Sequence, residues 1–197
     1  MANRGNAWEY RVAMRLDEFN TADAASAAAT VGLWAAIPEW VDAIVAARPY
    51  GSVDELAATA QARAEAWTDT DLDAALAHHP RIGRGSSAPG AEAEASRREQ
   101  AAMTDAAPSV AEAIAAGNIA YEERFGRVFL IRAAGRSPEE MLLELERRLR
   151  NDRQSEASEA LGQLAEIAIL RLRSSVTESE GRTASETTPA PSERIAP

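Results

Sequence analysis

Apolar side chains recur every three to four residues along most of the chain, which is the spacing of amphipathic helices. Several of these segments also carry helix-start signals. Pro38 opens one of them, Ser52 and Glu55 form a capping-box pattern ahead of the next, and Ser137 precedes a proline and two glutamates. We predict about eight helices from this pattern. Those with the clearest limits lie at residues 69–76, 91–103, 108–117, 118–125 and 155–172.

One apolar segment departs from this spacing. Residues 128–131 read Val-Phe-Leu-Ile without interruption, which is typical of a buried extended segment. Because β-branched runs are scarce elsewhere, we expect a connector rather than a strand of a sheet. Gly117 and Gly126 are expected to end two short helices, with Asn118 as the N-cap of the second. The predicted fold is therefore all-α, a single-domain bundle of about eight helices.

Both ends of the chain differ from the helical part. Residues 174–197 are rich in Ser, Thr, Glu and Pro, with hardly any large apolar side chain after Val176. Such a segment cannot bury enough surface to offset its ordering entropy, so we expect a disordered tail. We interpret residues 1–13 as an extension and residues 14–173 as the helical domain. No apolar run approaches the roughly 20 residues of a transmembrane helix, and the N-terminus lacks the apolar core of a signal peptide.

The bulk composition narrows the possible functions. Apolar residues make up 46% of the chain, which is enough for a packed core. The formal net charge of -10 argues against a nucleic-acid backbone or an anionic membrane as partner. The absence of cysteine removes disulfides, thiolate nucleophiles and cysteine metal sites, and it fits a reducing cytosol. We therefore expect a cytoplasmic protein that binds neither nucleic acid nor membrane.

The two histidines of the chain are adjacent, His78 and His79, and Pro80 follows them. Histidine is the side chain whose unperturbed pKa lies nearest neutral pH, so these positions are candidates for proton transfer. Pro80 disfavours a helical His79, which places His79 just after a helix and His78 still within it. On spacing alone, His79 is either a proton donor or acceptor or a capping residue. A metal site is not expected, because no third histidine exists and the carboxylates follow no ligand spacing.

A second candidate cluster is Ser96, Glu99 and Gln100. On a helix these residues fall at i, i+3 and i+4, so they share one face with Met103. A hydroxyl, a carboxylate and an amide beside an apolar side chain suit the wall of a polar pocket. The same pattern also suits a solvated face of a surface helix, and spacing does not separate the two interpretations.

The last predicted helix carries two arginines with different surroundings. Its inward stripe consists of Leu161, Leu164, Ala165, Ala168 and Leu172. At 100° per residue, Arg171 lies about 60° from the centre of this stripe and Arg173 about 140°. Arg171 is therefore expected at the border of the core and Arg173 in water. A border arginine either extends its guanidinium to the surface or presents its planar fork to a carboxylate or ureido group.

Taken in order along the chain, these segments resemble one family of enzymes. The matching segments are Arg48-Pro49-Tyr50, His79-Pro80-Arg81-Ile82-Gly83, Ser96 with Glu99 and Gln100, Asn118 with Tyr121, Arg124, Phe125 and Gly126, Phe129-Leu130-Ile131, Arg147-Arg148-Leu149 with Asn151, and Leu170-Arg171-Leu172. Each segment alone is weakly specific, but the ordered set is specific. Over about residues 14–173 the chain resembles the 2-oxo-4-hydroxy-4-carboxy-5-ureidoimidazoline (OHCU) decarboxylase family.

The resemblance implies an all-helical, cofactor-free lyase that commonly forms a homodimer. Its substrate is a small anionic ureido-imidazoline, and its product in urate breakdown is (S)-allantoin. By position, His79 and Glu99 match the catalytic pair of the family, and Arg171 matches its substrate-binding arginine. The rest of the implied pocket consists of Pro80, Ser96, Gln100, Phe129, Leu130, Ile131, Arg132 and Ala133.

The sequence leaves three points open. The family often has Phe-Gly-Phe-Pro-Phe where this chain has Arg127 and Val128 in the third and fourth places, so the rim of the pocket is undetermined there. The residues also allow a decarboxylase of a related ureido acid, because specificity depends on the shape of the pocket. A non-catalytic relative that binds a ureide or a partner protein is the third possibility, and the joint presence of His79, Glu99 and Arg171 counts against it.

Overall fold

In the described part of the chain the fold is helical apart from one short strand pair, in agreement with the predicted all-α class. The computed structural model describes residues 13–76, 82 and 106–179, and within them eight helices and two very short strands occur. The helices are α1 (Leu16–Thr21), α2 (Ala24–Gly32), α3 (Pro38–Ala46), α4 (Val53–Ala64), α5 (Asp69–Leu76), α7 (Pro108–Phe125), α8 (Pro138–Arg148) and α9 (Arg153–Ser175). The strands are β1 (Met14–Arg15) and β2 (Val176–Thr177), which pair in parallel. The predicted helix at 91–103 lies outside the described residues.

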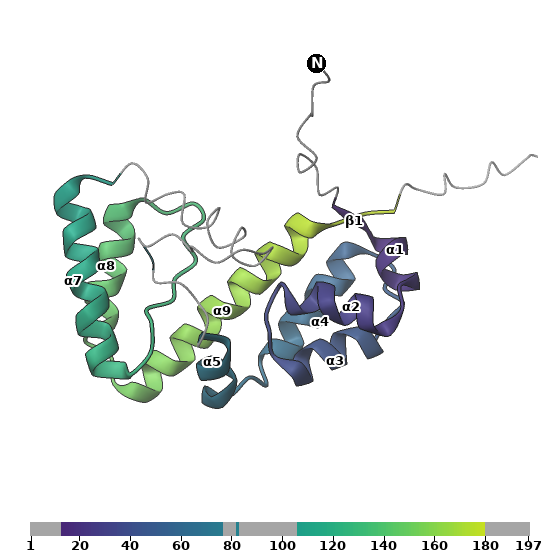
Figure 1. Ribbon diagram of the computed structural model, residues 1–197, viewed down its shortest axis with the longest axis horizontal. Coiled ribbons are helices and arrows are strands. Elements are labelled where there is room, and N and C mark those ends of the chain that lie inside the picture. Colours follow the sequence, from purple (N-terminus) through teal and green to yellow (C-terminus); the bar gives the residue numbers. More distant parts are fainter. Residues whose placement is uncertain (1–12, 77–81, 83–105, 180–197) are drawn as a thin grey trace, which may run out of the picture.

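One long helix organises the molecule. Figure 1 shows α9 running from the α7–α8 end to the α1–α4 end, with α5 beside its middle. Each end has its own apolar core. The first core draws on α1–α5 and most of α9, and the second draws on α7, α8 and the chain between them. Because α9 spans both ends, it fixes the relative placement of the two cores.

The segment between α7 and α8 lies at the boundary of the two cores. Leu130 belongs to the first core, whereas Phe129, Ile131 and Ala133 belong to the second. Alternation of side chains between two sides is the mark of an extended backbone. The predicted buried connector is therefore confirmed, and we call residues 128–133 the connector below.

Helix starts follow the local signals that the sequence carries. Ser137 Oγ accepts a hydrogen bond from the Glu140 amide at 3.2 Å, and Glu140 Oε2 accepts one from the Ser137 amide at 2.7 Å, which completes the box at α8. At α4, Ser52 Oγ accepts from the Glu55 amide at 3.0 Å. The Glu55 carboxylate, however, accepts from the amide of Gly51 rather than that of Ser52. The carboxylate thus binds one residue earlier than the motif predicts.

The prediction of two short helices at 108–117 and 118–125 is wrong. They form one continuous helix, α7, which ends at Gly126 with a φ of 76°. Gly117 lies within it because α8 approaches closely there: a Cβ at this position would lie 2.6 Å from Leu145 Cδ2. Asn118 is consequently not an N-cap. It is buried, and its amide donates to the Ile82 carbonyl at 3.0 Å.

The folded part extends beyond the predicted boundary at residue 173. Helix α9 continues to Ser175, and β2 then pairs with β1. Glu178 Oε1 accepts from the Val53 amide at 2.8 Å, and Ser179 Oγ accepts from the Asp17 amide at 3.0 Å. Residues 174–179 therefore belong to the fold. The composition did not predict this, because their contacts are made by polar atoms and by a strand pair. Residues 1–12 and 180–197 lie outside the described part of the chain.

In the part of the chain that the structure describes, no helix combines the length and apolar character needed to cross a bilayer.

Candidate active site

The structure covers part of the predicted site. Arg171 and residues 129–133 are described, whereas His79, Pro80, Ser96, Glu99 and Gln100 lie outside the described residues. Ile82, in the same motif as His79, is described and buried. Its carbonyl accepts the hydrogen bond from Asn118, so this point of the motif is fixed to α7.

Arg171 lies on the inner side of α9, as its angular position predicts. The residue is 7% exposed, and its Nη1 lies 3.4 Å and 3.5 Å from the carbonyl oxygens of Leu33 and Trp34. Arg173, by contrast, has a side chain that is 50% exposed and pairs with Asp54 at 2.7 Å. The prediction that separates the two arginines is confirmed. Arg171 places a buried positive charge where α9 meets the end of α2.

Two hydrogen bonds hold the connector, one to the residue before Ile131 and one to the residue after it. Arg148 Nη1 donates to the Leu130 carbonyl at 2.7 Å, and the Arg132 amide donates to Gln163 Oε1 at 2.9 Å. The first bond comes from the end of α8 and the second from α9. The backbone of the predicted substrate-binding segment is thus tied to two different helices.

The side chain of Arg132 is bound at the surface of α9. Its Nε donates to Glu166 Oε2 at 2.7 Å, and its Nη1 donates to the Ala134 carbonyl at 2.7 Å. Gln163 lies eight residues before Arg171, which is about 12 Å along a helix. The two described parts of the predicted site therefore lie along one helix, about two turns apart.

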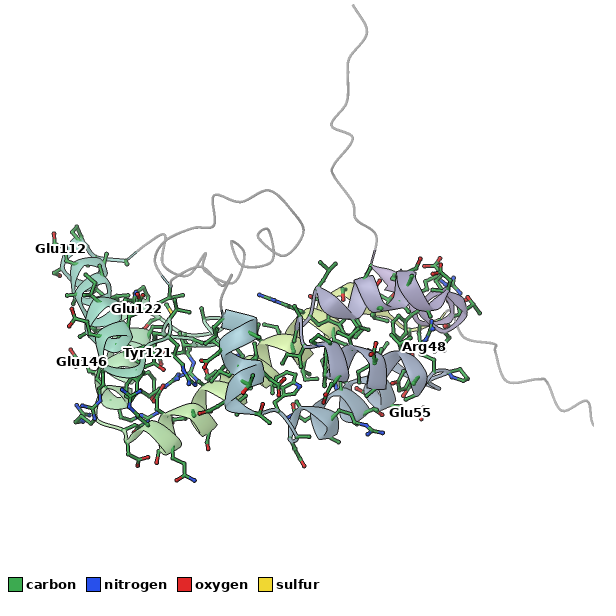
Figure 2. All side chains as sticks on the ribbon, turned by 60° about the horizontal axis from the view of Figure 1, so that its bottom comes forward. Arg48, Glu55, Glu112, Tyr121, Glu122 and Glu146 are labelled. Atoms are coloured by element: carbon green, nitrogen blue, oxygen red, sulfur yellow. The ribbon has the colours of Figure 1, made fainter. Side chains whose placement is uncertain are left out.

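A buried polar cluster supports this region, and sequence reasoning assigned it no role. Arg148 and Glu156 are each 1% exposed and form an ion pair. Glu156 also accepts hydrogen bonds from the Tyr121 hydroxyl and, at 2.9 Å, from Asn151 Nδ2. Burial raises the pKa of the Tyr121 phenol, and the hydrogen bond to Glu156 raises it further. Figure 2 shows Tyr121 in the α7–α8 part of the molecule, far from Arg48 and Glu55 at the other end.

A sequence signal for this cluster does exist. Glu156 begins the row of every fourth residue on α9, and the later members of the row are Ala160, Leu164, Ala168 and Leu172. All of these are buried. A carboxylate in an inward row requires a buried partner.

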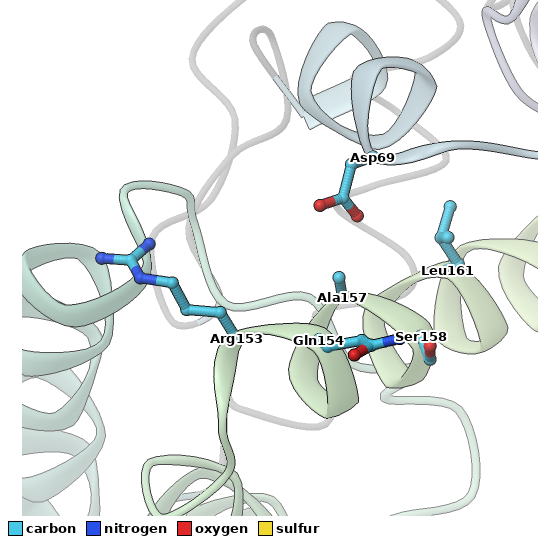
Figure 3. A pocket seen from close by; sticks show the side chains of 6 residues that line it. All are labelled: Asp69, Arg153, Gln154, Ala157, Ser158 and Leu161. Atoms are coloured by element: carbon cyan, nitrogen blue, oxygen red, sulfur yellow. The ribbon is translucent and has the colours of Figure 1, made fainter.

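Two cavities in the described part of the chain lie away from Arg171 and residues 129–133. The larger, of about 370 Å³, is lined by Asp69, Arg153, Gln154, Ala157, Ser158 and Leu161 (Figure 3). A smaller one of about 80 Å³ shares Asp69, Arg153 and Ala157 with it and is also lined by Arg127. Neither contains a residue that the resemblance assigns to the site, and exposed side chains line most of the larger one. In the same part of the chain, no three His, Cys, Asp or Glu side chains are grouped so as to hold a metal ion.

Comparison with known proteins gives one consistent result. The sequence model of the OHCU decarboxylase family matches residues 20–173. A crystal structure of OHCU decarboxylase in the presence of (S)-allantoin is similar, with 25% identity, a TM-score of 0.61, and coverage of 72% of this chain and 93% of that chain. A crystal structure of (S)-allantoin synthase shares the fold at 18% identity and a TM-score of 0.61, with coverage of 83% of this chain and 54% of that one. No curated protein matches. The match over most of the chain, on a helical fold with Arg171 turned inward, shows that this protein belongs to the OHCU decarboxylase family.

Proposed function

We propose that this chain converts OHCU to (S)-allantoin without a cofactor, with His79 and Glu99 as the catalytic pair and Arg171 as the substrate-binding cation. Membership of the family makes it a carboxy-lyase of urate breakdown. The observation that carries the proposal is the family match over residues 20–173, which includes all three of these positions. The buried position of Arg171 supports its assignment.

The chemistry fits these residue types. Loss of CO₂ leaves an electron pair on carbon, and the conjugated ring of the substrate can delocalise that pair. The protein must therefore hold the carboxylate out of the plane of the ring and then deliver a proton to one face of the carbon. In this proposal His79 moves the proton, and Glu99 orients the imidazole or the substrate hydroxyl. Delivery to one face accounts for a single enantiomer of the product.

Charge gives Arg171 its importance. The whole chain carries a formal net charge of -10, so attraction for an anionic substrate has to be local. A guanidinium at the border of the core offers two parallel donors in a region of low dielectric. Arg171 is proposed to bind the carboxylate or ureido group, and the backbone around Ile131 to bind the polar edge of the ring. Pro80, Ser96, Gln100 and the remaining residues of 129–133 complete the proposed pocket.

The assembly and compartment follow from the resemblance and the composition. We propose a homodimer in the cytoplasm, because the family commonly dimerises and the chain has no cysteine. Light scattering on the purified protein tests the dimer, and a monomeric mass at micromolar concentration would contradict it.

The decisive experiment generates the substrate freshly from urate and follows circular dichroism. Rapid appearance of the signal of (S)-allantoin is expected, and a rate no faster than the spontaneous racemic route would refute the proposed enzymatic activity.

His79→Ala is expected to reduce kcat about 10²- to 10⁴-fold, which is the range for loss of a general acid or base. Full activity of that variant would remove His79 from the proposed role.

Arg171 and Arg173 provide a matched pair for the binding step. Arg171→Gln is expected to raise KM about tenfold or more, whereas Arg173→Gln on the outer face of α9 is expected to leave KM unchanged. Equal effects of the two substitutions would argue against a substrate contact at Arg171. A related ureido acid turned over faster than OHCU would redefine the substrate and leave the residue roles in place.

A further inference from the structure

The buried ion pair between Arg148 and Glu156 requires an explanation beyond stability. Both side chains are withdrawn from water, at 1% exposure each. Desolvation of two charges offsets most of their attraction, so a buried pair commonly stabilises a fold no more than apolar residues of the same size would. What such a pair can supply is a fixed direction for the groups bound to it. The contacts of Arg148 show which groups these are.

Arg148 holds the connector through two consecutive residues. Its Nη1 donates to the Leu130 carbonyl at 2.7 Å, and its guanidinium carbon lies 4.8 Å from the centre of the Phe129 ring. Its Nε donates to Glu156 Oε1 at 3.0 Å, on the side facing α9. Glu156 is in turn fixed by Tyr121 on α7 and by Asn151 in the turn before α9. Through these contacts, the positions of α7, α8 and α9 together determine where the guanidinium holds the peptide group of Leu130.

Because the peptide bond is planar, this contact also determines the direction in which the Ile131 N–H points. The Leu130 carbonyl and the Ile131 amide belong to one planar trans unit, in which C=O and N–H point in opposite directions. Fixing the Leu130 oxygen on Arg148 therefore aims the Ile131 N–H away from Arg148. In the same way, the bond from the Arg132 amide to Gln163 aims the Ile131 carbonyl away from Gln163. Among the described residues, neither polar group of the Ile131 backbone has a hydrogen-bond partner of its own.

We propose that Arg148 and Glu156 are positioning residues, which, with Gln163, hold the donor and acceptor of the Ile131 backbone in the orientation that binds the amide-like edge of the substrate. This inference rests on the proposed function, in which residues 129–133 line the pocket. One N–H and one C=O from a single residue form the complementary set for a ring amide or a ureido group, each of which presents a C=O acceptor beside an N–H donor. Arg148 and Glu156 themselves do not touch the substrate in this arrangement.

The first test removes both buried charges together. In the double variant Arg148→Met with Glu156→Gln, no charge is left unpaired, and the glutamine still offers an oxygen to Tyr121. The Leu130 carbonyl loses its donor. At a temperature where the variant is fully folded, KM is expected to rise about five- to tenfold, with a smaller change in kcat. An unchanged KM in the folded variant would overturn the proposal.

The matched control is the neighbouring arginine. Arg147 lies one residue before Arg148, is partly exposed, and pairs with Glu144 and Glu159 rather than with the connector. Arg147→Met is expected to leave KM at the wild-type value. If activity falls in both variants only in proportion to the loss of folded protein, the pair has a structural role alone and the proposal fails.

Gln163→Met tests the second contact and leaves the buried pair intact. The residue is only partly buried, so this variant is expected to fold even if the double variant does not. KM should again rise severalfold, because the Ile131 carbonyl loses its fixed direction. A wild-type KM for Gln163→Met would overturn the proposal independently.

A measurement on the ligand-free protein separates this inference from the proposed function. Hydrogen exchange at the Ile131 amide is expected to be faster in the double variant than in Arg147→Met, because Arg148 no longer restrains the peptide group. Equal exchange in both would refute positioning by Arg148. A wild-type protein without decarboxylase activity would instead refute the proposed function, and the exchange result would still show whether Arg148 holds the connector.

Discussion

Gly117 shows how the role of one residue depends on its partner. The pattern of the sequence gives it the role of a helix stop, whereas in the structure it allows Leu145 of α8 to pack against α7. A glycine within a helix normally costs stability relative to alanine, so its presence is explained by this close approach. The information that distinguishes the two roles lies on another helix, where a local pattern does not reach.

Substitution of Gly117 by alanine is expected to destabilise the protein by about 1 kcal/mol, because the clash with Leu145 exceeds the gain in helix propensity. Gly162, on the exposed face of α9, has no atom within 4 Å of its Cβ position. Gly162→Ala is therefore expected to stabilise the protein by about 0.5 to 1 kcal/mol. Urea unfolding measures both. If both substitutions stabilise the protein, then α7 and α8 can move apart at position 117 without a loss of stability.

Glu159 is one residue that should make the free energy of unfolding decrease at acid pH. Partial burial by itself raises the pKa of this carboxyl, but hydrogen bonds from Arg147 and Asn151 outweigh that effect and hold it below the ordinary 4.5. A depressed folded-state pKa stabilises the protein above the unfolded pKa, and this stabilisation is lost as pH falls through the folded value. The free energy of unfolding should therefore fall as pH drops below about 4.5.

Glu159→Gln is expected to make that fall shallower, because the variant has no carboxyl to protonate at this position. Urea titrations between pH 7 and pH 3 provide the measurement. Arg147→Gln should act in the same direction, since it removes the first of the two donors that depress the pKa. Identical pH profiles for wild type and Glu159→Gln would contradict the assignment.

At the scale of elements, local signals made most helix starts predictable, whereas the ends of α7 and α9 were predicted less well. Helix α5 occupies the predicted range 69–76, and Pro38 and Pro138 open α3 and α8. These signals are local, because a cap binds amides within its own first turn. The contacts between elements were not predictable in this way. The Arg148–Glu156 pair joins residues on two helices, and the only signal that the sequence carries for it is the inward row that begins at Glu156, which the prediction did not use.

Helix α5 is tied to the turn after α7 by charge. Arg127 Nε lies 3.1 Å from Asp73 Oδ1, and its Nη1 lies 3.8 Å from Asp69 Oδ1. This arginine stands where the family often has phenylalanine, and in this chain it contacts α5. The His79 motif begins shortly after α5 ends. Arg127 therefore restrains the helix that leads into the proposed catalytic histidine.

Asp73→Asn is expected to cost no more than about 1 kcal/mol of stability, since the carboxylate is largely exposed. It should nevertheless lower kcat severalfold, because the end of α5 becomes less restrained. High salt should reduce kcat of the wild type toward that of the variant. Asp54→Asn, which removes an exposed partner of Arg173 far from this turn, serves as the control. Equal kcat values for all three proteins would show that α5 needs no such restraint.

At the scale of the whole molecule, composition and periodicity were sufficient to predict an all-α domain. They did not predict its division into two cores joined by α9. An inward stripe indicates that a helix packs, but not which other helix it packs against. The end of the fold was misplaced for a related reason, because polar atoms of residues 178 and 179 bind distant backbone amides.

Two truncations test the revised boundary. Deletion of residues 180–197 is expected to leave stability and turnover unchanged. Deletion of residues 178–197 also removes the carboxylate that accepts from Val53, the first residue of α4, and should lower the free energy of unfolding by about 1 kcal/mol. Turnover should survive both deletions. Glu178→Ala in the full chain should reproduce most of the difference, and equal stability of the two truncated forms would contradict this role.

The pairing of β1 with β2 has a consequence for the order of folding. Met14 and Val176 lie near opposite ends of the described residues, so their contact closes one of the largest loops in that part of the chain. Closure of a large loop is entropically costly until the intervening helices have packed, so we expect this step to follow the rate-limiting barrier. Contacts formed that late retard unfolding and leave the folding rate almost unaffected. We therefore expect the β1–β2 pair mainly to slow unfolding, which prolongs the lifetime of the native state more than it accelerates folding.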